Sequence, residues 1–200
     1  MKEITRRGLI FGAATAAAYG VLVGVERVCL STFADDAEPE DHSGPVKIVK
    51  FSDDGARLGI YALAKVRKNK SEWKKQLTPL QYDVTRRAAT EYAFSGALYD
   101  QHAPGLYRCL DCGNALFDSK AKFDSGTGWP SFWEAIATEN VREKKDFSMG
   151  ALRTEVKCTL CDAHLGHVFN DGPEPTGLRY CMNSAALRFV SRETRVRENS

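Results

Sequence analysis

Two Cys-x-x-Cys pairs, Cys109/Cys112 and Cys158/Cys161, constrain the fold of this 200-residue chain more than any other feature. Each pair can present two thiolates from one tight turn, and four thiolates form the closed tetrahedral site of structural zinc. The 45 residues between the pairs are too many for a minimal zinc ribbon, so we expect a β-sheet to bring the pairs together. Because four thiolates leave no open coordination position, the predicted zinc is structural and not catalytic.

Two other interpretations of these cysteines remain open. A pair of disulfides suits an oxidising compartment. A thioredoxin-like redox site is the other, but such a site needs a βαβ unit, which the pattern of this chain does not predict.

The N-terminus has the features of a bacterial twin-arginine (Tat) export signal. Arg6 and Arg7 precede residues 8–25, an uncharged apolar run rich in glycine and alanine. We expect cleavage after Ala34, which removes Cys29, places the mature protein in the periplasm and leaves no stable membrane insertion. The alternative is an uncleaved signal that anchors the protein to the inner membrane, since the run is near the lower length limit for a spanning helix.

The composition and charge balance are those of a globular protein that does not bind nucleic acid. With 43% hydrophobic residues, the chain is long enough to bury a core without disulfide staples. Residues 1–34 hold four of the 28 basic and two of the 26 acidic residues, which leaves 24 of each in the expected mature chain. A neutral protein lacks the basic surface that nucleic acids require.

One cysteine of the expected mature chain, Cys181, stands outside both pairs. An odd cysteine in an exported protein is a candidate reactive thiol. The alternative is a small buried hydrophobe, because unpaired cysteine is among the most buried residue types. We interpret Cys181 as the working thiol and residues 177–189 as the segment that presents it.

The order of patterns along the chain predicts a mainly β, α+β fold, with helices packed at one end of an antiparallel sheet core. Residues 35–45 are acidic and contain two prolines, which is typical of a flexible linker. Residues 46–66 predict a hairpin around the turn Asp54-Gly55. The short β runs that follow are clearest at residues 106–108, 115–117, 151–157, 164–169 and 179–190.

Residues 71–89 predict the helical part, with two helix starts. Ser71 is the expected cap of the first. Thr78 caps the second, with proline at the first helical position and Gln81 completing a capping box. The expected buried face consists of Leu80, Val84 and Ala88, which recur every four residues.

Two further stretches contain candidate site residues. Two glycines and a proline surround Trp129, so residues 123–133 predict a shaped loop that presents the ring, with a core tryptophan as the alternative. His164 and His167 would point to opposite faces of a flat strand, but a bulge at Gly166 would turn both to one side. A histidine near a cysteine can act as a general acid and can lower the pKa of the thiol.

Five motifs occur in order along the chain. They are Cys-x-x-Cys-Gly, Ser-Gly-Thr-Gly-Trp-Pro-Ser-Phe, a second Cys-x-x-Cys, His-Leu-Gly-His-Val-Phe-x-Asp-Gly-Pro and Arg-Tyr-Cys-Met-Asn-Ser. On these motifs, the chain from about residue 71 to 190 resembles the peptide-methionine (R)-S-oxide reductases, the type B methionine sulfoxide reductases. The predicted divisions are then a signal (1–34), a linker and added hairpin (35–70), the reductase domain (71–190) and a charged tail (191–200).

The resemblance implies two antiparallel sheets, a zinc held by the four paired cysteines, and reduction of the R epimer of methionine sulfoxide in proteins or peptides. It also implies roles for residues of this chain. Cys181 would attack the sulfoxide sulfur and remain as a sulfenic acid, while His164 and His167 would bind and protonate the oxygen. Trp129 would receive the methyl group of the substrate. The other implied site residues are Asn183, which would orient the polar network, and Phe169 and Arg179, which would belong to the substrate site.

Thr127 departs from a common form of the family, in which a resolving cysteine stands at this position. An internal disulfide with Cys181 is therefore not expected. The resemblance then implies that a thioredoxin-like protein or a small thiol reduces Cys181 directly. We expect the protein to be a monomer.

Two other functions fit parts of the pattern. A zinc-stapled module without catalysis would bind a peptide through Trp129 and Trp133, with Cys181 and the histidines as packing residues. A cysteine hydrolase would use Cys181 with a histidine, but no nucleophile elbow or helix start precedes Cys181. Reduction of racemic methionine sulfoxide by excess dithiothreitol separates the three, because only the reductase would stop at half conversion.

Overall fold

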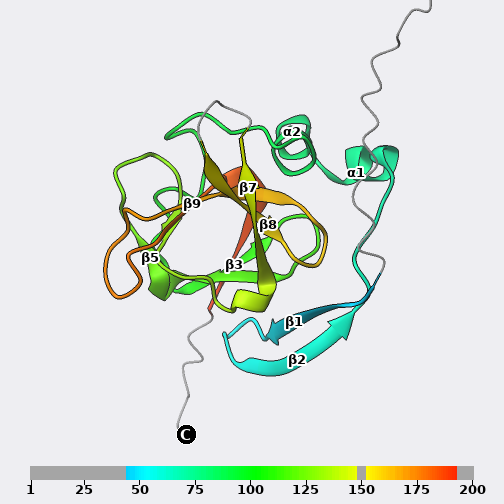
Figure 1. The fold of residues 1–200 in the computed structure, drawn as a ribbon, viewed down its shortest axis with the longest axis horizontal. Coiled ribbons are helices and arrows are strands. Elements are labelled where there is room, and N and C mark those ends of the chain that lie inside the picture. The colour runs from blue at the N-terminus through cyan, green and yellow to red at the C-terminus, as the bar shows by residue number, and fades with distance from the viewer. Residues whose placement is uncertain (1–43, 148–151, 193–200) are drawn as a thin grey trace, which may run out of the picture. The chain divides into compact units, whose positions relative to one another are not determined.

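The computed structural model describes residues 44–147 and 152–192, which belong to one compact unit of the chain (Figure 1). The predicted signal and linker, up to residue 43, and all but the first two residues of the predicted tail lie outside the described residues. Within the described ranges, no helix is long and apolar enough to cross a membrane.

Antiparallel sheets dominate the fold, as predicted. The hairpin of β1 (Val46–Phe51) and β2 (Arg57–Leu63) is a sheet of its own. The six-stranded sheet has the order β5 (Lys122–Phe123), β6 (Ser131–Phe132), β10 (Arg179–Met182), β9 (His164–Phe169), β8 (Arg153–Cys158) and β7 (Val141–Asp146). The three-stranded sheet has the order β11 (Leu187–Ser191), β3 (Gly105–Cys109) and β4 (Ala115–Asp118). The helical elements are α1 (Lys70–Gln76), α2 (Pro79–Arg87) and the short turns η1 (Ser119–Ala121), η2 (Thr138–Asn140) and η3 (Ser184–Ala186).

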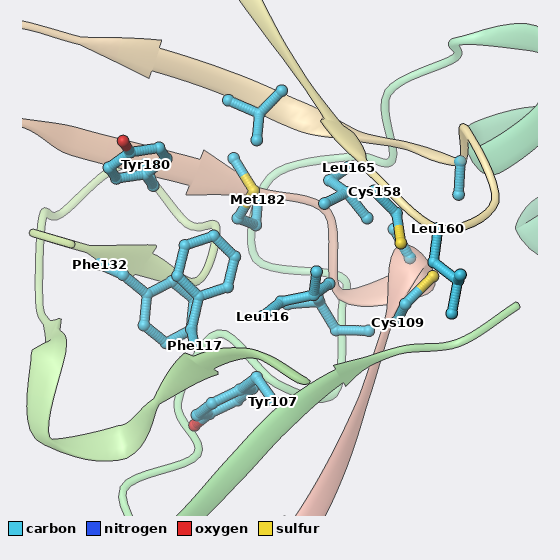
Figure 2. Packing of buried hydrophobic residues seen from close by; sticks show 14 of the residues in the cluster. Tyr107, Cys109, Leu116, Phe117, Phe132, Cys158, Leu160, Leu165, Tyr180 and Met182 are labelled. Carbon is cyan, nitrogen blue, oxygen red and sulfur yellow. The ribbon is translucent and has the colours of Figure 1, made fainter. Parts of the chain in front are cut away.

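The core combines side chains from the two larger sheets (Figure 2). Phe117 of β4 stacks on Phe132 of β6 with ring centroids 4.4 Å apart, and Tyr107 of β3 meets Phe132 edge-on at 4.8 Å. Leu165 and Met182, on β9 and β10, are also fully buried. Burying a side chain of this size contributes about 1.5–3 kcal/mol, so these contacts hold β9 and β10 firmly in place.

The structure confirms one of the two predicted helix caps. Asn69, not Ser71, caps α1: its side chain accepts from the backbone N–H of Glu72, whose carboxylate accepts from the backbone N–H of Asn69. Asn69 has a glutamate three residues later, as a capping box requires, and Ser71 does not. The predicted box of Thr78 and Gln81 at the start of α2 is confirmed.

The predicted buried face of α2 included three residues, and the prediction is wrong for two of them. Val84 is fully buried, but Leu80 is 53% exposed and Ala88 is the exposed C-cap in the left-handed region, at φ 54°. The helix has only nine residues, so Ala88 lies past its last turn and cannot extend the face. Its Thr85 is buried beside Val84, and α2 packs against β9 and η3, next to the end of β10.

The β1–β2 hairpin forms around Gly55, at φ 90°, where the sequence predicts it. It is packed against the body of the unit: Ile48 and Val49 are buried, and the side chain of Asn140 bonds both backbone groups of Val49. The same amide donates to the carbonyl of Ala115. A single buried side chain therefore joins the hairpin to β4.

Candidate active site and metal centre

Cys181 lies in β10, in the middle of the six-stranded sheet. It pairs with His167 of β9 on one side and with Ser131 of β6 on the other. A pocket of about 130 Å³, the Cys181 pocket, opens beside it. Its lining residues are Thr90, Trp129, Arg153, Gly166, His167, Phe169, Cys181, Met182 and Asn183. A larger hollow of about 360 Å³, formed by α1 and α2, contains none of the predicted site residues.

The Cys181 pocket collects most of the residues predicted for catalysis and substrate binding, namely Trp129, His167, Phe169, Cys181 and Asn183. His164 is outside the lining but next to His167, with ring centroids 5.4 Å apart. Arg179 is also outside the lining: its guanidinium donates two hydrogen bonds to Asp171 and lies over the ring of Phe169, at 4.5 Å. Arg179 therefore supports the pocket wall from behind Phe169.

The Cys181 thiol lies against a chain of hydroxyl groups. Thr127 Oγ1 is 3.9 Å from its Sγ, and Ser125 bonds both Thr127, at 2.8 Å, and Ser131, at 2.7 Å. Burial raises the pKa of Cys181 above its usual range, and the Thr127 hydroxyl and Arg179 guanidinium only partly offset this effect. Arg179 favours the thiolate, but burial has the larger effect on the pKa of Cys181, so the resting group at neutral pH is a thiol.

A bulge in β9 brings the ring of His164 against that of His167, which lies across from Cys181. Val156 of β8 pairs with Gly166, whereas the next residue, Lys157, pairs with His164, so Leu165 is the extra residue. The rings of His164 and His167 consequently meet edge-on instead of pointing to opposite faces. The expected bulge is therefore present in this strand, but its extra residue is Leu165 and not Gly166, which is paired on both sides.

Each histidine has a carboxylate partner that the sequence analysis missed. His164 Nδ1 is 2.7 Å from Glu155 Oε1, and His167 Nε2 is 2.8 Å from Asp146 Oδ2. Asp146 also accepts from Arg153, at 2.7 Å, which lines the pocket. Burial lowers the pKa of His167, and its bond to Asp146 opposes this only in part, so His167 is neutral at pH 7. The carboxylates hold the two rings in fixed orientations.

Glu91 connects several parts of the site and was also missed. Its backbone N–H donates to Asn183 Oδ1, at 3.0 Å, and its carbonyl accepts from Trp129 Nε1, at 3.2 Å. Its buried carboxylate accepts from the backbone N–H groups of Ser184 and Ala185, at 2.5 and 2.8 Å. These partners are up to 94 residues away in the chain, so no local pattern could indicate them.

The loop that carries Trp129 has the predicted irregular shape. Gly126 and Gly128 have φ values of 69° and 84°, which a glycine adopts without strain. The carbonyl of Pro130 accepts from the backbone N–H of Met182, which fixes the loop to β10. Trp133, proposed above as a second peptide-binding ring, is instead packed against the core.

The two Cys-x-x-Cys turns have the same local geometry. In the first, the backbone N–H of Gly113 donates to the carbonyl of Cys109, and in the second that of Asp162 donates to Cys158. Gly113 and Asp162 both have positive φ values, of 78° and 57°. Each turn follows a strand, β3 or β8, that contributes the first cysteine of the pair from its end.

The four thiols converge on one point. All four sulfur atoms lie within 4.8 Å of one another, and the pairs Cys109–Cys161 and Cys112–Cys158 are 3.6 Å apart. A disulfide requires about 2.05 Å, so the disulfide interpretation is wrong for this structure. Zinc–sulfur bonds of about 2.3 Å in a tetrahedron correspond to sulfur separations of about 3.8 Å, so the cluster has the dimensions of a metal site.

Donors from outside the turns point at the thiols. Arg86 of α2 donates to Cys161 Sγ at 3.5 Å and to the Cys161 carbonyl at 2.8 Å, and Asn114 Nδ2 lies 3.7 Å from Cys158 Sγ. Asp111 holds the Arg86 guanidinium from its other side. A cationic donor suits a cluster of four thiolates, whose negative charge exceeds that of one divalent ion.

A family model described as the SelR domain matches residues 77–191. The chain belongs to the SelR family. The peptide methionine sulfoxide reductase MsrB of Herminiimonas arsenicoxydans is 60% identical over 125 residues, 62% of this chain and 91% of the relative. A protein of the same name from Pseudomonas aeruginosa PAO1 is 54% identical over 132 residues, 66% of this chain and all of the relative. Another, from Synechococcus sp. RCC307, is 54% identical over 124 residues, 62% of this chain and 91% of the relative.

The SelR match contains both halves of the site. It begins after α1 and includes α2, the two larger sheets, the paired cysteines and every residue of the Cys181 pocket. The β1–β2 hairpin lies outside it, although it packs on the same unit. The resemblance to the type B methionine sulfoxide reductases is thereby confirmed at the level of the family.

Proposed function

We propose that this SelR-family protein is a peptide-methionine (R)-S-oxide reductase that repairs oxidised proteins. The observation that carries the proposal is the Cys181 pocket, in which one free thiol faces an aromatic ring, Trp129, and a carboxylate-held imidazole, His167. Reduction of a sulfoxide needs a nucleophilic sulfur, a proton donor for the oxygen and an apolar place for the thioether. The names of the relatives above support the same activity.

Cys181 supplies the nucleophile. Its thiolate attacks the sulfoxide sulfur, and in the net reaction the oxygen passes to Cys181 while the substrate leaves as a thioether. The substrate gains two electrons, and the thiol becomes a sulfenic acid. Because the resting thiol is protonated, its proton must leave before Cys181 can attack as a thiolate. The neutral imidazole of His167 can accept this proton.

His167 and His164 bind and protonate the sulfoxide oxygen. His167 lies directly across from Cys181 in the strand pair, and His164 Nε2 is buried without a hydrogen-bond partner among the described residues. The side-chain amide of Asn183 accepts from the backbone N–H of Glu91 and donates to the Leu165 carbonyl. These two hydrogen bonds fix its orientation in the pocket lining. Trp129 then receives the methyl group of the substrate.

Recycling proceeds through an outside thiol. Thr127 stands 3.9 Å from Cys181, at the place where a resolving cysteine would act. The other cysteines of the described residues belong to the four-thiol cluster. A thioredoxin-like protein or a small dithiol therefore reduces the sulfenic acid: two thiols supply two electrons, become a disulfide and release water.

The four-thiol cluster holds one structural zinc. The supporting observations are the sulfur separations, the matching turns and the Arg86 donor. Such a metal would join the end of β3 to the end of β8, and thus the two larger sheets. Its binding free energy would contribute to folding and not to the chemistry at Cys181.

We further propose Tat export to the periplasm, on the strength of Arg6, Arg7 and the apolar run after them. Fractionation of cells that express the whole chain, with and without Arg6→Lys and Arg7→Lys, tests it. Periplasmic protein that disappears in the double variant supports export. Protein that stays cytoplasmic in both contradicts it.

One assay tests the activity. A peptide with racemic methionine sulfoxide is incubated with the enzyme and excess dithiothreitol, and the epimers are separated by chromatography. We expect conversion to stop at half, with the S epimer left, and we expect Cys181→Ser to abolish turnover while the fold is retained. A folded wild-type protein that converts neither epimer would instead favour the peptide-binding module.

A further inference from the structure

A second hollow adjoins the Cys181 pocket. It has a volume of about 270 Å³ and is formed by β7, β8 and the segment from β9 to β10. Its lining residues are Glu143, Leu152, Arg153, Thr154, Val168, Phe169, Asn170 and Leu178. Arg153 and Phe169 line the Cys181 pocket as well, so the two cavities share a wall. We call the second cavity the flanking hollow.

Exposed apolar side chains mark this side of the molecule. Leu152, at the mouth of the flanking hollow, is 61% exposed, and Phe147, at the end of β7, is 68% exposed. Both are one residue away from a group of the site: Leu152 precedes Arg153, and Phe147 follows Asp146, the partner of His167. Isolated exposed apolar residues are common, but here one of them, Leu152, lines a cavity that shares a wall with the reactive one.

The Cys181 pocket has room for little more than one side chain. Its volume of about 130 Å³ is small beside the roughly 300–1,000 Å³ of sites that enclose a whole small molecule. A methionine sulfoxide in a protein is covalently joined to residues on both sides, which must leave the pocket across its rim. Side chains of an extended chain alternate between its two faces, so the next side chain on the face of the sulfoxide is two residues away. At about 3.3–3.6 Å per residue it lies about 7 Å along the chain, where it can enter the cavity on the other side of the wall that Phe169 and Arg153 form.

We propose that the flanking hollow binds an apolar side chain two residues away from the methionine sulfoxide in an extended polypeptide. This deepens the proposed function and rests on it. Leu152, Val168 and Leu178 supply the apolar surface. Thr154 and Asn170 supply polar groups at its border, which suit the backbone of a bound segment. The substrate preference is therefore for segments in which an apolar residue stands two positions before or after the oxidised methionine.

Short peptides test the flanking hollow. The substrates are N-acetyl-methionine sulfoxide methylamide, which has no flanking side chain, and blocked tripeptides in which one glycine separates the sulfoxide from a leucine, glycine or aspartate placed before or after it. kcat/KM is measured with dithiothreitol for the wild type, for Leu152→Ala and for Leu80→Ala. Leu80 is a matched control, since it is similarly exposed, at 53%, but lies on α2.

We expect leucine on one side to raise kcat/KM at least fivefold over glycine in the wild type. This ratio should fall at least threefold, toward one, in Leu152→Ala, since each buried methylene is worth about a fourfold change, and stay unchanged in Leu80→Ala. Equal rates for leucine and glycine on both sides, or a ratio that Leu152→Ala leaves intact, would overturn the inference. No turnover of any substrate, including the unflanked one, would count against the proposed function instead.

Discussion

Gly166 has no room for a Cβ atom beside β10, and replacing it should separate β9 from Cys181. It pairs with Met182, and a Cβ atom at this position would lie 2.1 Å from the carbonyl oxygen of Cys181 and 3.0 Å from Met182 Cα. Ordinary carbon–oxygen contacts are about 3.3 Å or longer, so Gly166→Ala requires the strands to move apart by about 1 Å. Neither neighbour can rotate away, because both contacts are with backbone atoms.

We expect the substitution to affect both stability and the reaction. Forcing one methyl group into a packed site costs about 1–3 kcal/mol of unfolding free energy. A displacement of about 1 Å between reacting groups can reduce a rate about 100-fold. Since His167 follows Gly166 and faces Cys181, the displacement falls directly between them.

Urea unfolding and a single-turnover assay measure the two effects separately. Gly44→Ala is the neutral control, since a Cβ there meets no described atom within 4 Å. Gly177→Ala controls for backbone strain, since its Cβ also meets nothing but its φ is +69°, which costs about 1–2 kcal/mol. A Gly166→Ala enzyme with the wild-type single-turnover rate would refute the reasoning, even if its stability had changed.

Four further predictions concern the thiols and the histidine. Cys109→Ser should remove the metal found by elemental analysis of the purified wild type and strongly lower the unfolding midpoint; a wild type without metal contradicts this. Because burial raises the pKa of Cys181, the rate of its alkylation by iodoacetamide, measured by mass spectrometry, should still increase above about pH 8.5, the usual thiol pKa. A rate that levels off near pH 7 would contradict this. His167→Ala should slow single-turnover reduction by about 10²–10⁴, and a near-normal rate would remove it from the mechanism. Thr127→Cys should form a disulfide with Cys181 after one turnover, whereas the wild type should yield a dimedone adduct of the sulfenic acid; an internal disulfide in the wild type would contradict direct reduction.

Parts of this protein follow from short-range patterns. The Cys-x-x-Cys turns and the capping box of Thr78 each form within a few residues, so their spacing in the sequence is enough to predict them. Cys181 could be singled out because it is left over when the other cysteines are paired. Near Gly166, the sequence indicated that the strand could bulge, and the pairing with β8 shows the bulge at Leu165.

Tertiary structure decided the rest. The carboxylate partners of the two histidines come from β7 and β8, and Glu91 reaches Asn183 across 92 residues, because sheet pairing brings distant segments together without any local signal. Tertiary structure also decided which residues of α2 are buried. The buried face of this helix depends on where β9 and η3 lie and not on periodicity alone. The sequence by itself therefore determined which groups we propose for the chemistry, because a candidate thiol, imidazole or metal ligand is a property of single side chains and short turns. Only the tertiary structure decided their orientation and their protonation, because these depend on burial and on partners that the chain supplies from far away.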